Sequence, residues 1–220
     1  MSTSLTPKIK LSWEERLALE QSCWKKGCQR VAGLDEAGRG PLAGPVVAAI
    51  FVITSDFNYT EVNDSKQLTP LRREKLFKLL TSGKWDYGVG IVEPEEIDRI
   101  NIYQASRLAM LKAVRSLRCQ PDYLLVDALV VPETTIPQEA IIHGDARSIA
   151  IAAASIIAKH TRDQIMIDYE RIYPGYGFAK HKGYPTREHY QALDRLGPSP
   201  IHRKSFCLEK RLSKKSLPLF

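Results

Sequence analysis

Apolar and polar residues alternate along WDYGVGIVE, residues 85–93, which predicts a strand with Trp85, Tyr87, Val89 and Ile91 on one face. Continuous apolar runs predict further strands at 45–53 (PVVAAIFVI), 123–128 (YLLVDA) and 140–145 (AIIHGD), and a short stretch from Val31 predicts one that ends at Asp35. The β-branched run 45–53 is long enough for a buried strand. The first two strands follow each other closely, as in a hairpin.

Apolar positions at helical spacing predict helices elsewhere. The expected helices are 13–23, 69–80, 102–118, 146–172 and 186–196, with another near the C-terminus. Ser12, Thr69 and Thr186 are expected N-caps, and Gly83 and Gly197 stand where two of the helices end. Because strands and helices intermix along the chain, the expected fold is α/β, a mixed sheet flanked by helices.

Size and composition limit the classes of protein. The 220 residues suit one domain with a modest extension, and 44% hydrophobic and 26% charged residues are ordinary for a globular chain. No apolar run reaches a membrane span, and the N-terminus lacks the apolar core of a signal peptide, so a cytoplasmic protein is expected. Cys23 and Cys28 lack the second pair of a zinc site. The net charge of +7 favours polyanionic partners.

Acidic residues stand at the ends of predicted strands. Asp35, Asp127 and Asp145 each end a short apolar strand, and Glu36 adjoins the first. Sites collect at strand ends in open α/β sheets, so these acids are candidates to converge. Converging carboxylates repel one another, and a hard divalent cation such as Mg²⁺ or Mn²⁺ removes that repulsion. Two such ions serve in-line displacement at phosphorus.

Each aspartate also has a simpler interpretation as a helix cap or turn residue, Asp145 as the cap of the long helix. Glu36 points away from Asp35 if strand alternation continues, and joins it if the strand ends there.

The turn at Gly38, Arg39 and Gly40 fits two phosphate-binding motifs loosely. The G-x-G-x-x-A spacing of a dinucleotide site is present, but Pro45 and a strand follow where that motif needs a helix. The P-loop spacing has Arg39 and Gly40 where Lys and Ser or Thr belong. Both are rejected. A loop remains whose backbone can approach a ligand closely, with an arginine able to contact phosphate.

Seven sequence blocks together resemble bacterial type 2 ribonuclease H, ribonuclease HII. The signature GLDEAGRGPLAGPVVAA is followed in family order by NDSKQLT, VDA, HGD, IAAASIIAKHTRD, YGFAKHKGYPT and HRKSF, over about residues 30–206. The resemblance implies a ribonuclease H-like mixed sheet with a C-terminal helical extension. It also implies a metal-dependent endonuclease that cuts the RNA strand of RNA–DNA hybrids and incises 5′ of single ribonucleotides in duplex DNA. Both reactions leave 3′-hydroxyl and 5′-phosphate ends.

The resemblance also assigns site residues. The four acidic positions fall on Asp35, Glu36, Asp127 and Asp145, which would hold two Mg²⁺ or Mn²⁺ ions. Gly38, Arg39 and Gly40 correspond to the element whose backbone reads the ribose 2′-hydroxyl, the group that separates RNA from DNA. Tyr184 corresponds to the tyrosine that stacks on the following deoxyribose.

Other charged and polar residues receive weaker assignments. Lys66, Lys182 and Arg203 are candidate phosphate contacts, with a solvated surface charge as the alternative for each. Asp163 is expected in a structural ion pair, and Ser155 and Lys159 in helix packing beside the site. His160 stands where many family members carry a small apolar residue.

The expected organisation is an N-terminal helical extension (1–29), a catalytic domain (30–206) and a basic tail (207–220). A monomer is expected, and SLPLF at 216–220 is a candidate peptide for a sliding clamp. Type 3 enzymes are one alternative, but the roughly 30 residues before the first motif are too few for their extra domain, and their fourth acid is usually glutamate. A catalytically silent binding module is the other, and four retained acids argue against it.

Overall fold

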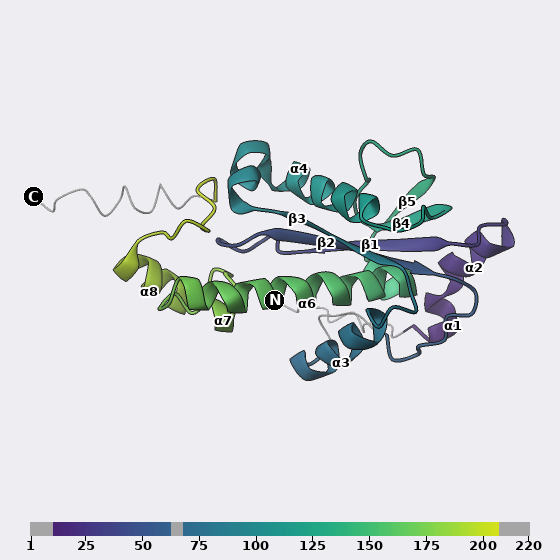
Figure 1. Cartoon of the computed structure of the whole chain (residues 1–220), viewed down its shortest axis with the longest axis horizontal. Coiled ribbons are helices and arrows are strands. Elements are labelled where there is room, and N and C mark those ends of the chain that lie inside the picture. The colour runs from purple at the N-terminus through teal and green to yellow at the C-terminus, as the bar shows by residue number, and fades with distance from the viewer. Residues whose placement is uncertain (1–10, 63–67, 207–220) are drawn as a thin grey trace, which may run out of the picture.

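A five-stranded mixed sheet forms the centre of the computed structural model, which describes residues 11–62 and 68–206 (Figure 1). The strands are β1 (Val31–Ala37), β2 (Val46–Ile53), β3 (Tyr87–Val92), β4 (Tyr123–Asp127) and β5 (Gln138–Ile141), in the spatial order β3-β2-β1-β4-β5. The hairpin β1–β2 and the pair β2–β3 are antiparallel, whereas β4 lies parallel to both β1 and β5. The predicted α/β class and mixed sheet are confirmed.

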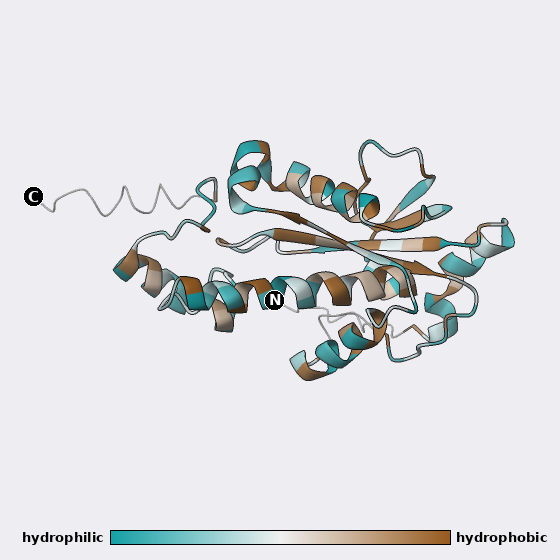
Figure 2. Cartoon of the chain, viewed as in Figure 1, coloured by the Kyte–Doolittle hydropathy of each residue, from teal (hydrophilic) through white to brown (hydrophobic). Residues whose placement is uncertain are grey.

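Helices cover both faces of the sheet. On one face lies α4 (Pro94–Arg115); on the other lie α6 (Ile149–Ile172) and α3 (Pro70–Leu80) (Figure 1). All eight residues of β2 are buried between these layers, and apolar residues gather along the strands (Figure 2). Next to the sheet, α6 packs unusually close, because a Cβ on Gly33 of β1 would come within 2.1 Å of the Ala150 carbonyl carbon.

The ends of the described chain pack onto this core. At the N-terminal end, α1 (Trp13–Arg16) and α2 (Ala18–Lys25) pack on the core cluster of the α6 side, which includes Cys23 of α2 and Leu17 between the two helices. At the C-terminal end, α7 (Phe178–His181) and α8 (Arg187–Leu196) form a third cluster with the far end of α6. No described helix has the length and apolar character to cross a membrane.

Several local predictions agree with the structure. The hydroxyls of Ser12, Thr69 and Thr186 accept hydrogen bonds at the starts of α1, α3 and α8, and Gly197 ends α8 with a φ of 73°. The predicted helix 102–118 is the second part of α4. Asn101, at a φ of 67°, kinks α4, and its Oδ1 accepts from the backbone N–H groups of Tyr103 and Gln104.

Two predictions around Asp145 are wrong. The strand β5 ends at Ile141, and His143, at a φ of 56°, turns the chain into the short helix α5 (Gly144–Arg147), which carries Asp145. The cap of α6 is Ser148, whose hydroxyl accepts from Ile151 N. Leu17 also divides the predicted helix 13–23 in two. The predicted helix near the C-terminus falls in 207–220, outside the described residues.

Candidate active site

The parallel pair β1–β4 brings the first two candidate acids side by side. Leu34 lies opposite Val126 in this pair. The next step of the same register places Asp35 beside Asp127, and residues in register share one face of the sheet.

Hydrogen bonds orient Asp35, which is only 5% exposed. One carboxylate oxygen, Oδ1, accepts from Glu36 N at 2.7 Å. The Ser155 hydroxyl on α6 also donates to this carboxylate. Ser155, predicted as packing beside the site, therefore contacts a candidate metal ligand directly.

Asp127 and Asp145 are linked through the start of α5. Asp127 Oδ1 accepts from Gly144 N at 2.7 Å, and Gly144 precedes Asp145. Asp145 is 5% exposed, and its backbone carbonyl accepts from Arg16 Nη2 at 3.3 Å. The bond from Gly144 therefore ties the third aspartate to the end of β4.

The carboxyl groups affect one another electrostatically. Burial raises the pKa of Asp35 well above its ordinary value, and the charges of Glu36, Asp127 and Asp145 raise it further. Burial also raises the pKa of Glu36; Arg39 opposes that shift and Asp127 adds to it. Such mutual repulsion is typical of carboxylates gathered for a functional purpose.

Glu36 has features of both alternatives given by the sequence: it lies within β1, yet its charge acts on Asp35. The strand β1 continues through Ala37, so strand alternation places the side chains of Glu36 and Asp35 on opposite faces of the sheet. The Glu36 carboxylate nevertheless raises the pKa of Asp35. Its Oε1 accepts from Arg39 Nη1 at 3.4 Å, and its buried Oε2 has no hydrogen-bond partner among the described residues.

The chemistry of the four acids suits a divalent metal ion. They supply only oxygen donors, they repel one another, and Glu36 Oε2 is buried without a partner among residues 11–62 and 68–206. Within those ranges no three His, Cys, Asp or Glu side chains lie close enough together to hold a metal ion as they stand. The carboxyl groups are thus electrostatically coupled but not drawn together into ligand geometry.

Two buried arginines hold the loop 38–45, which contains the Gly38–Gly40 turn. Arg203 donates to the carbonyl oxygens of Gly38 (2.6 Å), Arg39 (3.0 Å) and Gly44 (2.9 Å). At Gly38, φ is 100°, and a Cβ would come within 2.1 Å of Arg162 Nε, so only glycine fits. Arg203 is fully buried, so the structure contradicts its candidate role as a phosphate contact.

Arg162 completes the clamp from α6 and was missed by the sequence analysis. It is fully buried and donates to the carbonyl oxygens of Pro45 (3.0 Å), Lys182 (3.0 Å) and Ala43 (3.1 Å). Its burial could have been predicted from the helical spacing, because Arg162 lies four residues from Ala158 and four from Met166, both buried on α6.

The Tyr184 ring lies beside this turn. A Cβ built on Gly40 would be 3.9 Å from Tyr184 Cε1, and the side chain is 39% exposed. Lys159 Nζ and Arg162 Cζ lie 5.6 and 5.8 Å from the ring centroid. The structure therefore brings Tyr184 and the turn together.

The remaining charged candidates are accounted for in part. Asp163 accepts from Lys159 (2.7 Å) and Arg73 (3.2 Å), which confirms the predicted ion pair. Lys182 Nζ donates to the Ala179 carbonyl. Lys66 lies outside the described residues.

The N-terminal helices also reach the site, which the sequence analysis missed. Arg16 donates to the carbonyl oxygens of Val62 (2.8 Å) and Asp145 (3.3 Å). Glu20 on α2 is fully buried and accepts from Ser148 Oγ (2.6 Å) and Ala150 N (2.9 Å). A carboxylate from α2 thus stabilises the N-terminus of α6, the helix that carries Ser155.

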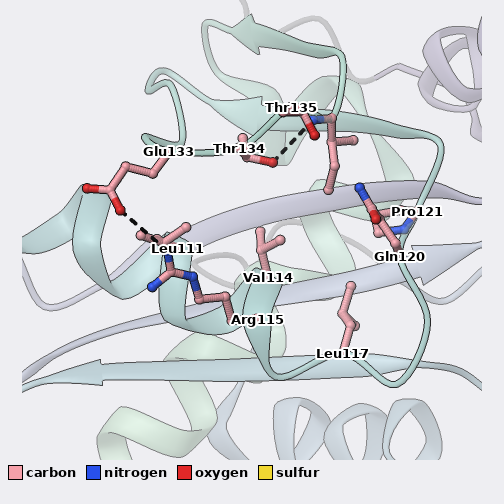
Figure 3. A pocket seen from close by; sticks show the side chains of 10 residues that line it. Leu111, Val114, Arg115, Leu117, Gln120, Pro121, Glu133, Thr134 and Thr135 are labelled. Atoms are coloured by element: carbon pink, nitrogen blue, oxygen red, sulfur yellow. Dashed lines mark hydrogen bonds and ion pairs between the residues drawn. The ribbon is translucent and has the colours of Figure 1, made fainter.

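A separate pocket of about 310 Å³ lies between the end of α4 and the loop before β5 (Figure 3). Arg115 and Glu133 form an ion pair across it at 3.3 Å. It sits at the end of the parallel strands opposite the acids, and none of the candidate site residues lines it.

Two buried histidines, His189 and His202, predict how folding stability depends on pH. Burial lowers the pKa of His189 and of His202 to about 4; the charge of His181 lowers both values further, and that of His189 lowers the pKa of His202. Between pH 6.5 and 4 the unfolded chain therefore binds more protons than the folded chain. The contribution of these two groups to folding stability is complete above pH 6.5 and is lost as the pH falls from 6.5 to 4. The expected loss is about 1 kcal/mol per pH unit for each histidine.

The raised pKa values of Asp35 and Glu36 act in the opposite direction, so each histidine is best followed by the NMR shift of its C2 proton. No titration of His189 or His202 is expected between pH 8 and about 5. A midpoint near 6.5 for either would contradict the prediction.

Solved structures place this arrangement in a class. Ribonuclease H2 from Pyrococcus horikoshii OT3 matches with a TM-score of 0.72 at 33% identity, covering 84% of this chain and 98% of that one. Ribonuclease HII in the PCNA:RNase HII complex from Archaeoglobus fulgidus matches with a TM-score of 0.69 at 25% identity, covering 86% and 98%. The fold is that of a ribonuclease H, an endoribonuclease.

Sequence comparison gives the family. Ribonuclease HII of Clostridioides difficile (strain 630) is 53% identical over 197 residues, 88% of this chain and 77% of that protein. The family model Ribonuclease HII matches residues 32–209. The chain belongs to the ribonuclease HII family, as the resemblance predicted.

Proposed function

We propose that this ribonuclease H, besides cutting the RNA strand of RNA–DNA hybrids, incises duplex DNA on the 5′ side of a single embedded ribonucleotide. Both reactions would depend on divalent metal and leave 3′-hydroxyl and 5′-phosphate ends. One observation carries the proposal: the coupled carboxylates, the clamped Gly38–Gly40 turn and the exposed Tyr184 ring adjoin one another.

Asp35, Glu36, Asp127 and Asp145 would hold the metal, Mg²⁺ or Mn²⁺, with two ions favoured by the number of acids. When bound, such ions activate water and stabilise charge on the leaving oxygen. The bonds from Ser155 to Asp35 and from Gly144 to Asp127 orient the carboxylates beforehand. The phosphodiester is hydrolysed without a covalent intermediate on the protein.

The turn would select the ribose. Because Arg203 binds the carbonyl oxygens of Gly38 and Arg39, the turn holds one backbone conformation before the substrate arrives. Glycine at positions 38 and 40 lets the main chain approach a sugar closely. A 2′-hydroxyl both donates and accepts hydrogen bonds, so a fixed peptide group can recognise it and reject deoxyribose.

We expect Tyr184→Ala to reduce incision at a single ribonucleotide about 10-fold, with a smaller loss on a long hybrid. Stacking of an aromatic side chain on a base contributes on the order of 1–3 kcal/mol, and we take the lower end of that range, about 10-fold in rate, for a contact with a sugar. The measurement is the ratio of kcat/KM on the two substrates. Tyr103→Ala is the matched control, since Tyr103 is 48% exposed and has Arg107 5.7 Å from its ring centroid. Equal losses on both substrates would remove Tyr184 from junction reading.

The test of the whole proposal uses a DNA duplex with one labelled ribonucleotide, incubated with Mg²⁺, Mn²⁺ or a chelator. Incision immediately 5′ of the ribonucleotide, abolished by the chelator, is expected. Cleavage of long hybrids alone would keep the metal site and reject the ribose-reading role of Gly38–Gly40 and Tyr184. Binding without cleavage of either substrate would favour a silent binding module.

We extend the proposal to a sliding clamp as partner of a monomeric enzyme, because the Archaeoglobus fulgidus relative was solved as a complex with PCNA. The candidate peptide SLPLF, residues 216–220, and the basic tail lie outside the described residues. Co-elution of the protein with a clamp, lost on removal of SLPLF, tests this.

A further inference from the structure

Three buried imidazoles contact one another beside the backbone of Tyr184. His181, His189 and His202 are 7%, 0% and 3% exposed. The rings of His181 and His189 stack with centroids 4.4 Å apart and planes inclined by 18°, and His189 Nε2 lies 2.9 Å from His202 Nε2. Neither the metal site nor the ribose-reading turn uses these side chains.

The hydrogen bonds fix the proton on each ring. Ser199 N donates to His202 Nδ1 at 2.9 Å, so the proton of neutral His202 is on Nε2. That proton is donated to His189 Nε2, so His189 carries its own proton on Nδ1 and donates it to the Tyr184 carbonyl at 2.9 Å. The chain of donors runs in one direction, from Ser199 to Tyr184.

His181 holds the other side of the same residue. Gly183 N donates to His181 Nδ1 at 3.2 Å, and His181 Nε2 lies 2.8 Å from the Tyr176 carbonyl, to which it donates. His181 O also accepts from Tyr184 N at 2.9 Å. The His181 imidazole therefore binds the Lys182–Gly183 peptide group, close before Tyr184, and the stacked His189 imidazole binds the peptide group directly after Tyr184.

The backbone near Tyr184 is anchored on further sides, whereas its ring is not covered. Gly183 O accepts from Leu42 N at 2.8 Å, and Lys182 O accepts from Arg162 Nη1 at 3.0 Å. The ring remains 39% exposed beside Gly40. A fixed main chain under an exposed flat ring is an arrangement suited to holding a contact surface in place for a sugar or base.

We infer that His189, supported by His181 and His202, is a positioning residue that sets the Tyr184 ring beside Gly40 and so determines selectivity for single ribonucleotides. This inference rests on the proposed function. It assigns His189 no contact with substrate; its effect passes through the Tyr184 carbonyl.

Two amide variants separate this role from simple packing. In His189→Asn the side-chain amide can occupy the Nδ1 position and keep the bond to the Tyr184 carbonyl, while the bond from His202 is lost. In His189→Gln the side-chain oxygen can keep the bond from His202, while the bond to Tyr184 is lost. Both remove the ring stacked on His181, so they are matched in that loss.

We expect His189→Gln to lower the ratio of single-ribonucleotide to long-hybrid kcat/KM about 10-fold, the effect of one buried hydrogen bond, and His189→Asn to stay within about 3-fold of the wild type. In the double variant Tyr184→Ala/His189→Gln the ratio should fall no further than in Tyr184→Ala. Equal ratios in the two His189 variants, or additive losses in the double variant, would overturn the inference.

Two controls complete the test. If Tyr184→Ala leaves the ratio unchanged, the junction-reading role of Tyr184 in the proposed function fails; if it lowers the ratio and His189→Gln does not, only the inference fails. Should a variant not fold, ¹⁵N NMR of the wild-type histidines decides: His189 protonated on Nδ1 is expected, and protonation on Nε2 alone would rule out the bond to Tyr184.

Discussion

Replacing Asp127 by asparagine is expected to lower cleavage of an RNA–DNA hybrid at least about 1,000-fold while hybrid affinity changes little. Removing one carboxylate from a metal site costs several kcal/mol of transition-state stabilisation. Binding depends mainly on cations that contact phosphate, and loss of a negative charge does not weaken it. Asparagine keeps an Oδ1 that can accept from Gly144 N, the bond now 2.7 Å long, so the local backbone should persist.

The same variant should be at least as stable as the wild type, because the Asp127 charge raises the pKa of both Asp35 and Glu36 and its removal relieves that repulsion. Single-turnover cleavage, hybrid binding and thermal unfolding would be measured together. Asp168→Asn, on the 51% exposed side chain of Asp168 on α6, is the control for loss of one carboxylate. Undiminished turnover, or unfolding of Asp127→Asn, would remove Asp127 from the proposed site.

Arg203→Met is expected to lower the free energy of unfolding by about 3 kcal/mol and to reduce cleavage of both hybrid and single-ribonucleotide substrates. Methionine fills part of the volume but leaves the carbonyl oxygens of Gly38, Arg39 and Gly44 without the donor they now share. Each buried acceptor left unpaired costs about 1–3 kcal/mol. Relief of repulsion from Arg162, which with burial lowers the pKa of Arg203 to about 9, offsets part of this loss.

Denaturant unfolding measures the first effect and steady-state cleavage the second. Arg99→Met is the matched control, since Arg99 has a 70% exposed side chain and pairs only with Glu96 in the described contacts. A stability loss no larger than that of Arg99→Met would show that Arg203 does not hold the turn.

Most of the sheet and part of the site could be predicted from the sequence. The apolar runs that form β2 and β4 have a local cause, and the end of β4 at Asp127 is visible in the pattern itself. The convergence of Asp35 with Asp127 needed only a parallel pairing of two strands. Asp145 was misplaced because a left-handed residue at His143 starts a helix where the pattern still read as a strand.

The arginine clamp could not be predicted from the sequence. Arg162 and Arg203 bind main-chain carbonyl oxygens, and every residue has one, so the residue types in the sequence do not indicate these partners. Their partners Pro45 and Gly38 lie 117 and 165 positions away. An arginine within a basic segment such as HRKSF is more often a surface charge, and only the fold shows that this one is buried.

The contact between Glu20 and the start of α6 has a consequence for synthesis on the ribosome. Glu20 lies 128 and 130 positions before its partners Ser148 and Ala150. At about 5–20 residues per second, a nascent chain would wait roughly 6–26 s after Glu20 emerges before those partners exist. Throughout that interval the first two helices have no α6 to dock on. Translation of α6 therefore sets the earliest time at which α1 and α2 can dock, and a chain released before α6 is made would leave both helices exposed.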